Sequence, residues 1–220
     1  MTLTIPNLLT LFRLLAAPGV VLAFVFLPRP IADWVALVLF ILASVTDYID
    51  GYLARKWQQI SKIGTMLDPI ADKAMVVIAL LALGVWSPLA KVIAVPAAVI
   101  LFREVFVSGL REFLGDVAGT LKVTKLAKWK TAVQMVAIAV LILQGVFNHH
   151  LGMAVFGMDA QTISDVLNGG EADPVGLRGM MFRAEWGGYL GIALIWVAAV
   201  LTGVTGWDYF VKARRHLGGQ

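Results

Sequence analysis

The chain has 220 residues, of which 60% are hydrophobic and 15% are charged, and its mean hydropathy is +0.84. This composition is too apolar for a soluble globular domain and is typical of an integral membrane protein. The absence of cysteine excludes disulfides and thiolate metal sites. The net charge of +4 is modest, and we expect no nucleic-acid partner.

Apolar runs of about 20 residues, the length that crosses a bilayer as a helix, recur along the chain. They predict six transmembrane helices, over residues 7–27, 33–53, 68–86, 89–110, 126–147 and 187–211. We therefore expect one all-α integral membrane domain over residues 1–220. No removable signal peptide is expected, because Arg13 interrupts the first apolar stretch. Residues 148–186 predict a surface loop that carries one short amphipathic helix over residues 160–167.

The distribution of basic residues predicts the orientation in the membrane. Six spans place both ends of the chain on the same side, and the side with more Lys and Arg is normally cytoplasmic. Of the 18 Lys and Arg residues, all but four fall on the side of the chain ends; the exceptions are Arg29, Lys91, Arg178 and Arg183. Both termini are therefore predicted to be cytoplasmic.

Four aspartates gather where the second predicted span ends and the third begins, in the stretch "DYIDGYLARKWQQISKIGTMLDPIADK". Asp47 and Asp50 share one helix face, and Gly64, Asp68 and Asp72 share another. Carboxylates this close repel one another, and Mg²⁺ or Mn²⁺ would neutralise them while keeping ligand positions for phosphate. The alternative is that each aspartate is solvated separately at the membrane surface.

Small residues and one cation accompany these aspartates. Gly51 and Ala54 lie on or beside the first acidic face, where they leave room for a ligand to approach the backbone. Arg55 is the nearest cation and could hold a phosphate. The complete pattern D-x2-D-G-x2-A-R-x8-G-x3-D-x3-D resembles the signature of the CDP-alcohol phosphatidyltransferase family at every fixed position.

The resemblance implies a two-metal site with Mg²⁺ or Mn²⁺. Asp47 and Asp68 would bridge both ions, Asp50 would complete the first, and Asp72 would complete the second and act as general base. Contacts to the CDP group are expected from Gly51, Ala54, Arg55, Ser61 and Gly64. The resemblance also implies a homodimer in the bacterial cytoplasmic (inner) membrane, with the sites facing the cytoplasm.

Three flanking stretches, "IPNLLTLFRLLAAP", "REVFVSGLRE" and "KWKTAVQM", resemble a bacterial branch of this family. That branch transfers the phosphatidyl group of CDP-diacylglycerol to sn-glycerol 3-phosphate, and it releases CMP in phospholipid biosynthesis. The acceptor is a dianion and needs cations. The candidate acceptor residues are Arg103, Arg111, Lys125, Lys128 and Lys130.

Other interpretations remain open. Cardiolipin synthase and phosphatidylinositol phosphate synthase share the aspartate pattern and differ in acceptor. A cation-coupled transporter would instead place its carboxylates near the middle of the bilayer. Two further charged residues stand out: Arg13 lies deep in the first span, and Glu104 is expected to pair with a neighbouring Arg or Lys.

Overall fold

A computed structural model describes residues 4–57, 61–115, 119 and 125–217, with the side chains of residues 48, 50–55, 125, 127, 128 and 217 outside the description. The described residues contain helices and no strand, as predicted. In chain order the helices are α1 (Ile5–Phe26), α2 (Ile31–Trp57), α3 (Lys62–Trp86), α4 (Ala90–Leu114), α5 (Lys125–Ala154), α6 (Ala160–Asn168) and α7 (Leu177–Leu217).

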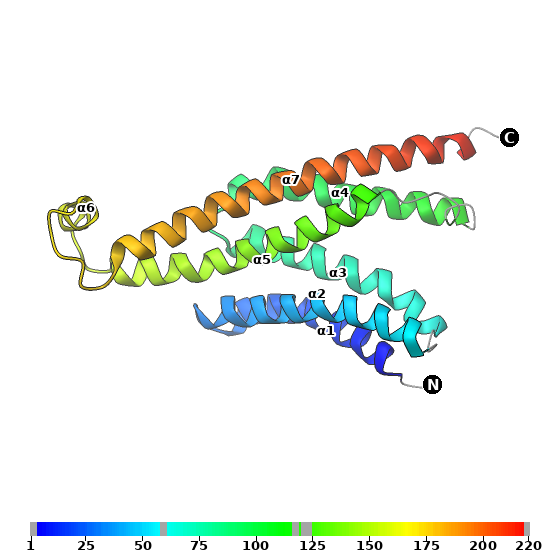
Figure 1. Cartoon of the computed structure of the whole chain (residues 1–220), viewed down its shortest axis with the longest axis horizontal. Helices are drawn as coiled ribbons and strands as arrows, with labels where there is room; N and C mark the ends of the chain where they lie inside the picture. The colour runs from blue at the N-terminus through cyan, green and yellow to red at the C-terminus, as the bar shows by residue number, and fades with distance from the viewer. Residues whose placement is uncertain (1–3, 58–60, 116–118, 120–124, 218–220) are drawn as a thin grey trace.

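The long helices form two packed groups (Figure 1). In one group α1 packs against α2 and α3, and in the other α7 packs along both α4 and α5; α2 and α3 join the two groups by contacting α5 and α4. The beginning of α1 and the end of α7 lie at one end of the molecule, and α6 lies at the opposite end. Buried alanines, including Ala17, Ala36, Ala79 and Ala198, let the helices approach closely.

The prediction of an integral membrane protein is supported by the apolar helices. Within the described part of the chain, five helices, α1, α3, α4, α5 and α7, are long and apolar enough to cross a membrane. Large apolar side chains such as Phe102 and Val105 point outward with 70% and 72% of their surface exposed, as expected for contact with lipid. The remaining predicted span, over residues 33–53, coincides with α2, part of which lies outside the described side chains, so the number six stays a prediction.

The third predicted span begins earlier than expected. The apolar run predicts a start at Asp68, whereas α3 begins at Lys62, so Asp68 and Asp72 lie inside the helix. Ser61 is the N-cap, and its hydroxyl accepts a hydrogen bond from the backbone N–H of Gly64 at 2.9 Å. The apolar run marks where the helix enters lipid, and the cap determines where the helix itself starts.

The prediction of a surface loop over residues 148–186 is wrong at both ends. α5 continues to Ala154 and α7 already begins at Leu177. The predicted short helix is confirmed as α6, which is capped at its start by Asp159 and at its end by Gly169 with φ 86°. The apolar runs did not predict the end of α5 and the start of α7, because these parts contain polar residues. A helix that extends beyond the lipid no longer needs an apolar sequence.

Candidate active site

Three of the four aspartates meet at one arginine. Asp47 of α2 and Asp68 and Asp72 of α3 each form an ion pair with the guanidinium of Arg13 on α1. The Asp68 carboxylate lies 2.7 Å from Nη2, while Asp47 and Asp72 both contact Nη1. Arg13 is only 1% exposed, whereas the three carboxylates are 38–45% exposed. The acidic faces of α2 and α3 therefore converge beside α1, with one open side.

The donor set at this point fits a hard divalent cation. Three carboxylates from two helices converge on one centre of positive charge, and carboxylate oxygens are the ligands that Mg²⁺ and Mn²⁺ prefer. Among the described residues, no group of three or more acidic or histidine side chains is already arranged to hold a metal ion. The point where the carboxylates converge holds the Arg13 guanidinium instead. The fourth predicted ligand, Asp50, lies outside the described side chains.

Ser61 and Gly64 join α3 to α1. The Ser61 hydroxyl donates a hydrogen bond to Oδ1 of Asn7 at 2.7 Å. A β-carbon at Gly64 would lie 2.6 Å from the same oxygen and 3.1 Å from Ser61 Oγ, so only glycine allows this approach. Of the residues predicted to contact CDP, these two are described and lie at the start of α3. The side chains of Gly51, Ala54 and Arg55 are outside the described residues.

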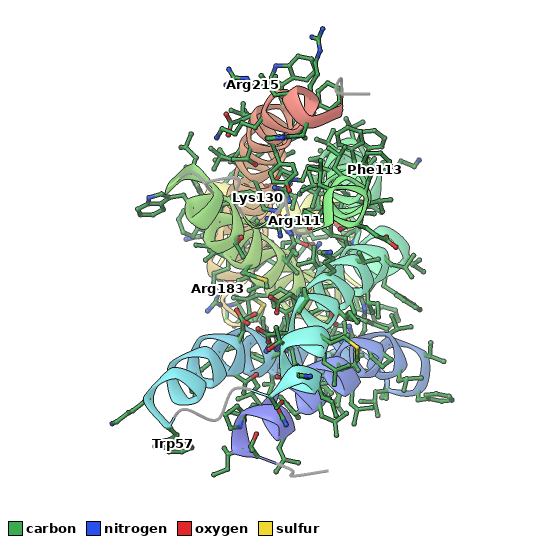
Figure 2. The ribbon with its side chains drawn as sticks, turned by 90° about the vertical axis from the view of Figure 1, so that its right-hand side faces the viewer. Trp57, Arg111, Phe113, Lys130, Arg183 and Arg215 are labelled. Atoms are coloured by element: carbon green, nitrogen blue, oxygen red, sulfur yellow. The ribbon has the colours of Figure 1, made fainter. Side chains whose placement is uncertain are left out.

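A pocket of ≈ 270 Å³ opens next to the aspartates and extends toward α4 and α5. Asp47 and Asp72 lie on one wall, and three of the predicted acceptor cations lie on the others: Arg103, Arg111 and Lys130. Figure 2, which looks at the end of the molecule where the chain begins and ends, shows Arg111 and Lys130 close together between α4, α5 and α7. The side chains of Lys125 and Lys128 are outside the described residues.

Glu104 arranges the cations of this pocket. Its carboxylate lies 2.5 Å from the Lys130 ammonium and 3.2 Å from Nη1 of Arg103, which confirms the predicted pairing with a neighbouring cation. All three side chains are largely buried. With Lys73 and Arg111 also on its walls, the pocket holds four cations and three carboxylates. The carboxylates Asp47 and Asp72 lie on one side, so the remainder of the pocket is suited to an anion.

Some site residues were not assigned from the sequence. The sequence predicts that Arg13 lies deep in the first span but does not connect it with the aspartates, and it predicts no site role for Asn7. The signal was present in both cases, because each is a polar residue within an apolar helix, where a partner is expected. Tyr209 of α7, whose ring lies 5.4 Å from the guanidinium carbon of Arg111, had no comparable signal.

Comparisons with known proteins identify the family of the chain. Residues 3–166 match the family model described as CDP-alcohol phosphatidyltransferase. A protein of Cereibacter sphaeroides is 58% identical over 217 residues, which cover 99% of this chain and 98% of the relative. Proteins of Rickettsia bellii (34% over 212 residues, 96% of each chain) and Haemophilus influenzae (39% over 156 residues, 70% of this chain and 82% of the relative) are also similar. All three are named CDP-diacylglycerol–glycerol-3-phosphate 3-phosphatidyltransferase. The chain belongs to the CDP-alcohol phosphatidyltransferase family.

Proposed function

We propose that this protein transfers the phosphatidyl group of CDP-diacylglycerol to sn-glycerol 3-phosphate, producing phosphatidylglycerophosphate and CMP. The observation that carries the proposal is the pocket that places Arg103, Arg111 and Lys130 next to Asp47 and Asp72. A phosphorylated acceptor held by these cations would present its hydroxyl toward the carboxylates. The names of the similar bacterial proteins support the same reaction.

The carboxylates carry the chemistry of the reaction. The acceptor hydroxyl attacks the β-phosphorus of CDP-diacylglycerol, a new P–O bond forms to the acceptor, and the bond to the leaving CMP breaks. Asp47, Asp50, Asp68 and Asp72 would hold two Mg²⁺ or Mn²⁺ ions, which supply positive charge to the phosphate oxygens. Asp72 lines the pocket and would accept the hydroxyl proton as general base. A carboxylate is a weak base, so its position next to the hydroxyl must supply much of its effect.

The residues expected to contact the donor substrate lie on other parts of the chain than the acceptor cations. Ser61 and Gly64, at the start of α3, would contact the CDP group together with Gly51, Ala54 and Arg55. This arrangement separates the nucleotide from the acceptor: the nucleotide residues belong to α2 and the beginning of α3, and the acceptor cations belong to α4 and α5. The attacking hydroxyl and the CMP leaving group would then approach the phosphorus from different directions.

We place the enzyme in the bacterial inner membrane, with six spans including α2 and with both chain ends and the site facing the cytoplasm. The start of α1 and the end of α7 lie at the same end of the molecule (Figure 1), and most Lys and Arg residues belong to that side. The diacylglycerol chains would remain in the bilayer while the headgroup meets soluble acceptor at the surface. A second copy of the chain is the expected partner, as the family resemblance implies.

An acceptor panel tests the proposed reaction. Purified protein in lipid nanodiscs receives CDP-diacylglycerol with sn-glycerol 3-phosphate, inositol 1-phosphate, serine or phosphatidylglycerol, and CMP release and lipid product are followed. We expect turnover with glycerol 3-phosphate alone, its loss in EDTA, and its return with Mg²⁺ or Mn²⁺. Turnover with phosphatidylglycerol instead would identify a cardiolipin synthase, and CMP release that needs no divalent ion would contradict the two-metal site.

Two arginine variants test the acceptor site. Removing one charge-assisted contact to phosphate costs roughly 1.5–3 kcal/mol, which is about ten- to a hundred-fold in kcat/KM. Arg103→Ala and Arg111→Ala should therefore lower kcat/KM for glycerol 3-phosphate by that factor, mainly through KM, and leave the KM for CDP-diacylglycerol nearly unchanged. Arg215→Ala, an exposed residue near the end of α7, is the matched control. If both variants keep wild-type KM and kcat, these arginines do not bind the acceptor.

A further inference from the structure

The final long helix, α7, contacts the acceptor cations without lining the pocket. Gly206 of α7 packs against the side chain of Arg103, and the ring of Tyr209 lies against the guanidinium of Arg111. The two α7 residues are three positions apart and share one helix face. Neither one is among the residues that line the pocket, so each can influence the acceptor only through its arginine.

Gly206 determines how closely the stem of Arg103 approaches α7. A β-carbon at position 206 would lie 2.8 Å from Cγ of Arg103 and 3.7 Å from its Nε. The nearest atom belongs to the base of the side chain rather than its flexible tip, so any larger residue must displace the whole guanidinium. Gly203, one turn earlier on the same helix, offers a contrast, because a β-carbon there would meet no atom of the described residues within 4 Å.

Tyr209 provides a flat surface for Arg111. The guanidinium carbon of Arg111 lies 5.4 Å from the ring centroid, within the range of a cation–π contact. Arg111 itself is exposed in the last turn of α4, where an unsupported arginine would sample many rotamers. Tyr209 is only 9% exposed, and its hydroxyl has no hydrogen-bond partner among the described residues. The ring, not the hydroxyl, is therefore the part of Tyr209 that makes the defined contact.

We propose that Gly206 and Tyr209 are positioning residues of α7 that hold the Arg103 and Arg111 guanidiniums where they bind the acceptor phosphate. The inference rests on the proposed function of this pocket and deepens it. Both residues lie beyond residues 3–166, the part that matches the family model. The carboxylate chemistry and the support for the acceptor cations thus come from different parts of the chain.

Four single substitutions in the purified full-length protein test this role by steady-state kinetics. Gly206→Ala and Tyr209→Leu should raise the KM for glycerol 3-phosphate by about three- to tenfold, the effect expected from losing one cation–π contact or displacing one guanidinium. The KM for CDP-diacylglycerol should stay unchanged and kcat should stay within about twofold, because the metal ligands and the base are untouched. Gly203→Ala and Tyr209→Phe should behave as wild type, the second because it keeps the ring.

The outcomes separate positioning from a general effect on the fold. Equal increases in both KM values, or no increase in either, would overturn the inference. A Tyr209→Phe variant as impaired as Tyr209→Leu would also overturn it, since the hydroxyl would then matter and not the ring. If Gly206→Ala does not fold, the Tyr209 pair decides alone. If the wild type uses another phosphorylated acceptor, the proposed function is wrong, and the same comparison made with that acceptor still tests α7.

Discussion

Arg13 is predicted to stabilise the metal-free protein by neutralising the aspartates. The substitution Arg13→Met removes the positive charge and keeps a long, flexible apolar side chain of similar reach. Three carboxylates, from Asp47, Asp68 and Asp72, would then face one another without their common cation. Because the same carboxylates are the proposed metal ligands, a bound divalent ion should replace the missing charge.

The expected size follows from the burial of the four groups. Removing one partner of a buried ion pair costs about 3–5 kcal/mol. Arg13 is buried, but its three partners are 38–45% exposed and partly screened by water. We therefore expect the free energy of unfolding to fall by about 2–3 kcal/mol without metal. For a chain of this size, that corresponds to a Tm lower by about 4–12 °C. With Arg13 no longer competing, Mg²⁺ should bind about tenfold more tightly or better.

Thermal unfolding followed by tryptophan fluorescence, once in EDTA and once in excess Mg²⁺, measures both effects. The matched control is Arg29→Met, because Arg29 also pairs with a buried aspartate, with its Nε 3.4 Å from Oδ2 of Asp33, but does so away from the site. The Tm of Arg29→Met should lie below that of the wild type by the same amount in EDTA and in Mg²⁺. The Tm of Arg13→Met should return most of the way to the wild-type value in Mg²⁺. The reasoning is refuted if the Arg13→Met deficit is independent of Mg²⁺, or if the variant binds Mg²⁺ more weakly than wild type.

Three further predictions address the proposed base Asp72, the contact of Gly64 with α1, and the hydrogen bonds of Asp173 at the start of α7. Asp72→Asn should lower kcat by at least about 10²-fold while CDP-diacylglycerol binding survives; near-normal turnover in the CMP assay would remove Asp72 from the role of base. Gly64→Ala should cost about 0.5–1.5 kcal/mol in thermal unfolding, because its β-carbon would lie 2.6 Å from Asn7 Oδ1 and displace that oxygen from the Ser61 hydroxyl. Gly84→Ala, whose β-carbon would meet no described atom within 4 Å, should cost nothing. Backbone N–H groups, of Arg178 first and then of Leu177, hold the pKa of Asp173 below its usual 3.8. Because this pKa is depressed, the hydrogen bonds from Leu177 and Arg178 to the Asp173 carboxylate stabilise the fold fully above pH 3.8, and this stabilisation is lost as the pH falls through the lower pKa of the folded state. Pepsin cleavage near residue 173 should therefore increase only below pH 3.8. Asp173→Asn should abolish that dependence.

Much of the architecture followed from local sequence properties. The apolar runs predicted long helices because a chain in lipid must satisfy its backbone hydrogen bonds internally. Asp68 and Asp72 could be assigned to one helix face, because a helix brings residues four apart onto the same side whatever surrounds it. Composition and the periodicity of single helices were sufficient for these conclusions. The acidic site and the family resemblance rest on the same short stretch of sequence.

Only the tertiary structure decided which charges meet. Arg13 and Asp72 are far apart in the chain, and their contact depends on how α1 packs against α3. The same holds for Glu104 with Lys130, and for Tyr209 beneath Arg111. A helix determines the direction of its side chains relative to its own axis, but the neighbour of each side chain depends on the rotation and depth at which the helices pack. Those two quantities come from the burial of small residues along every helix at once, and no single stretch of sequence contains them.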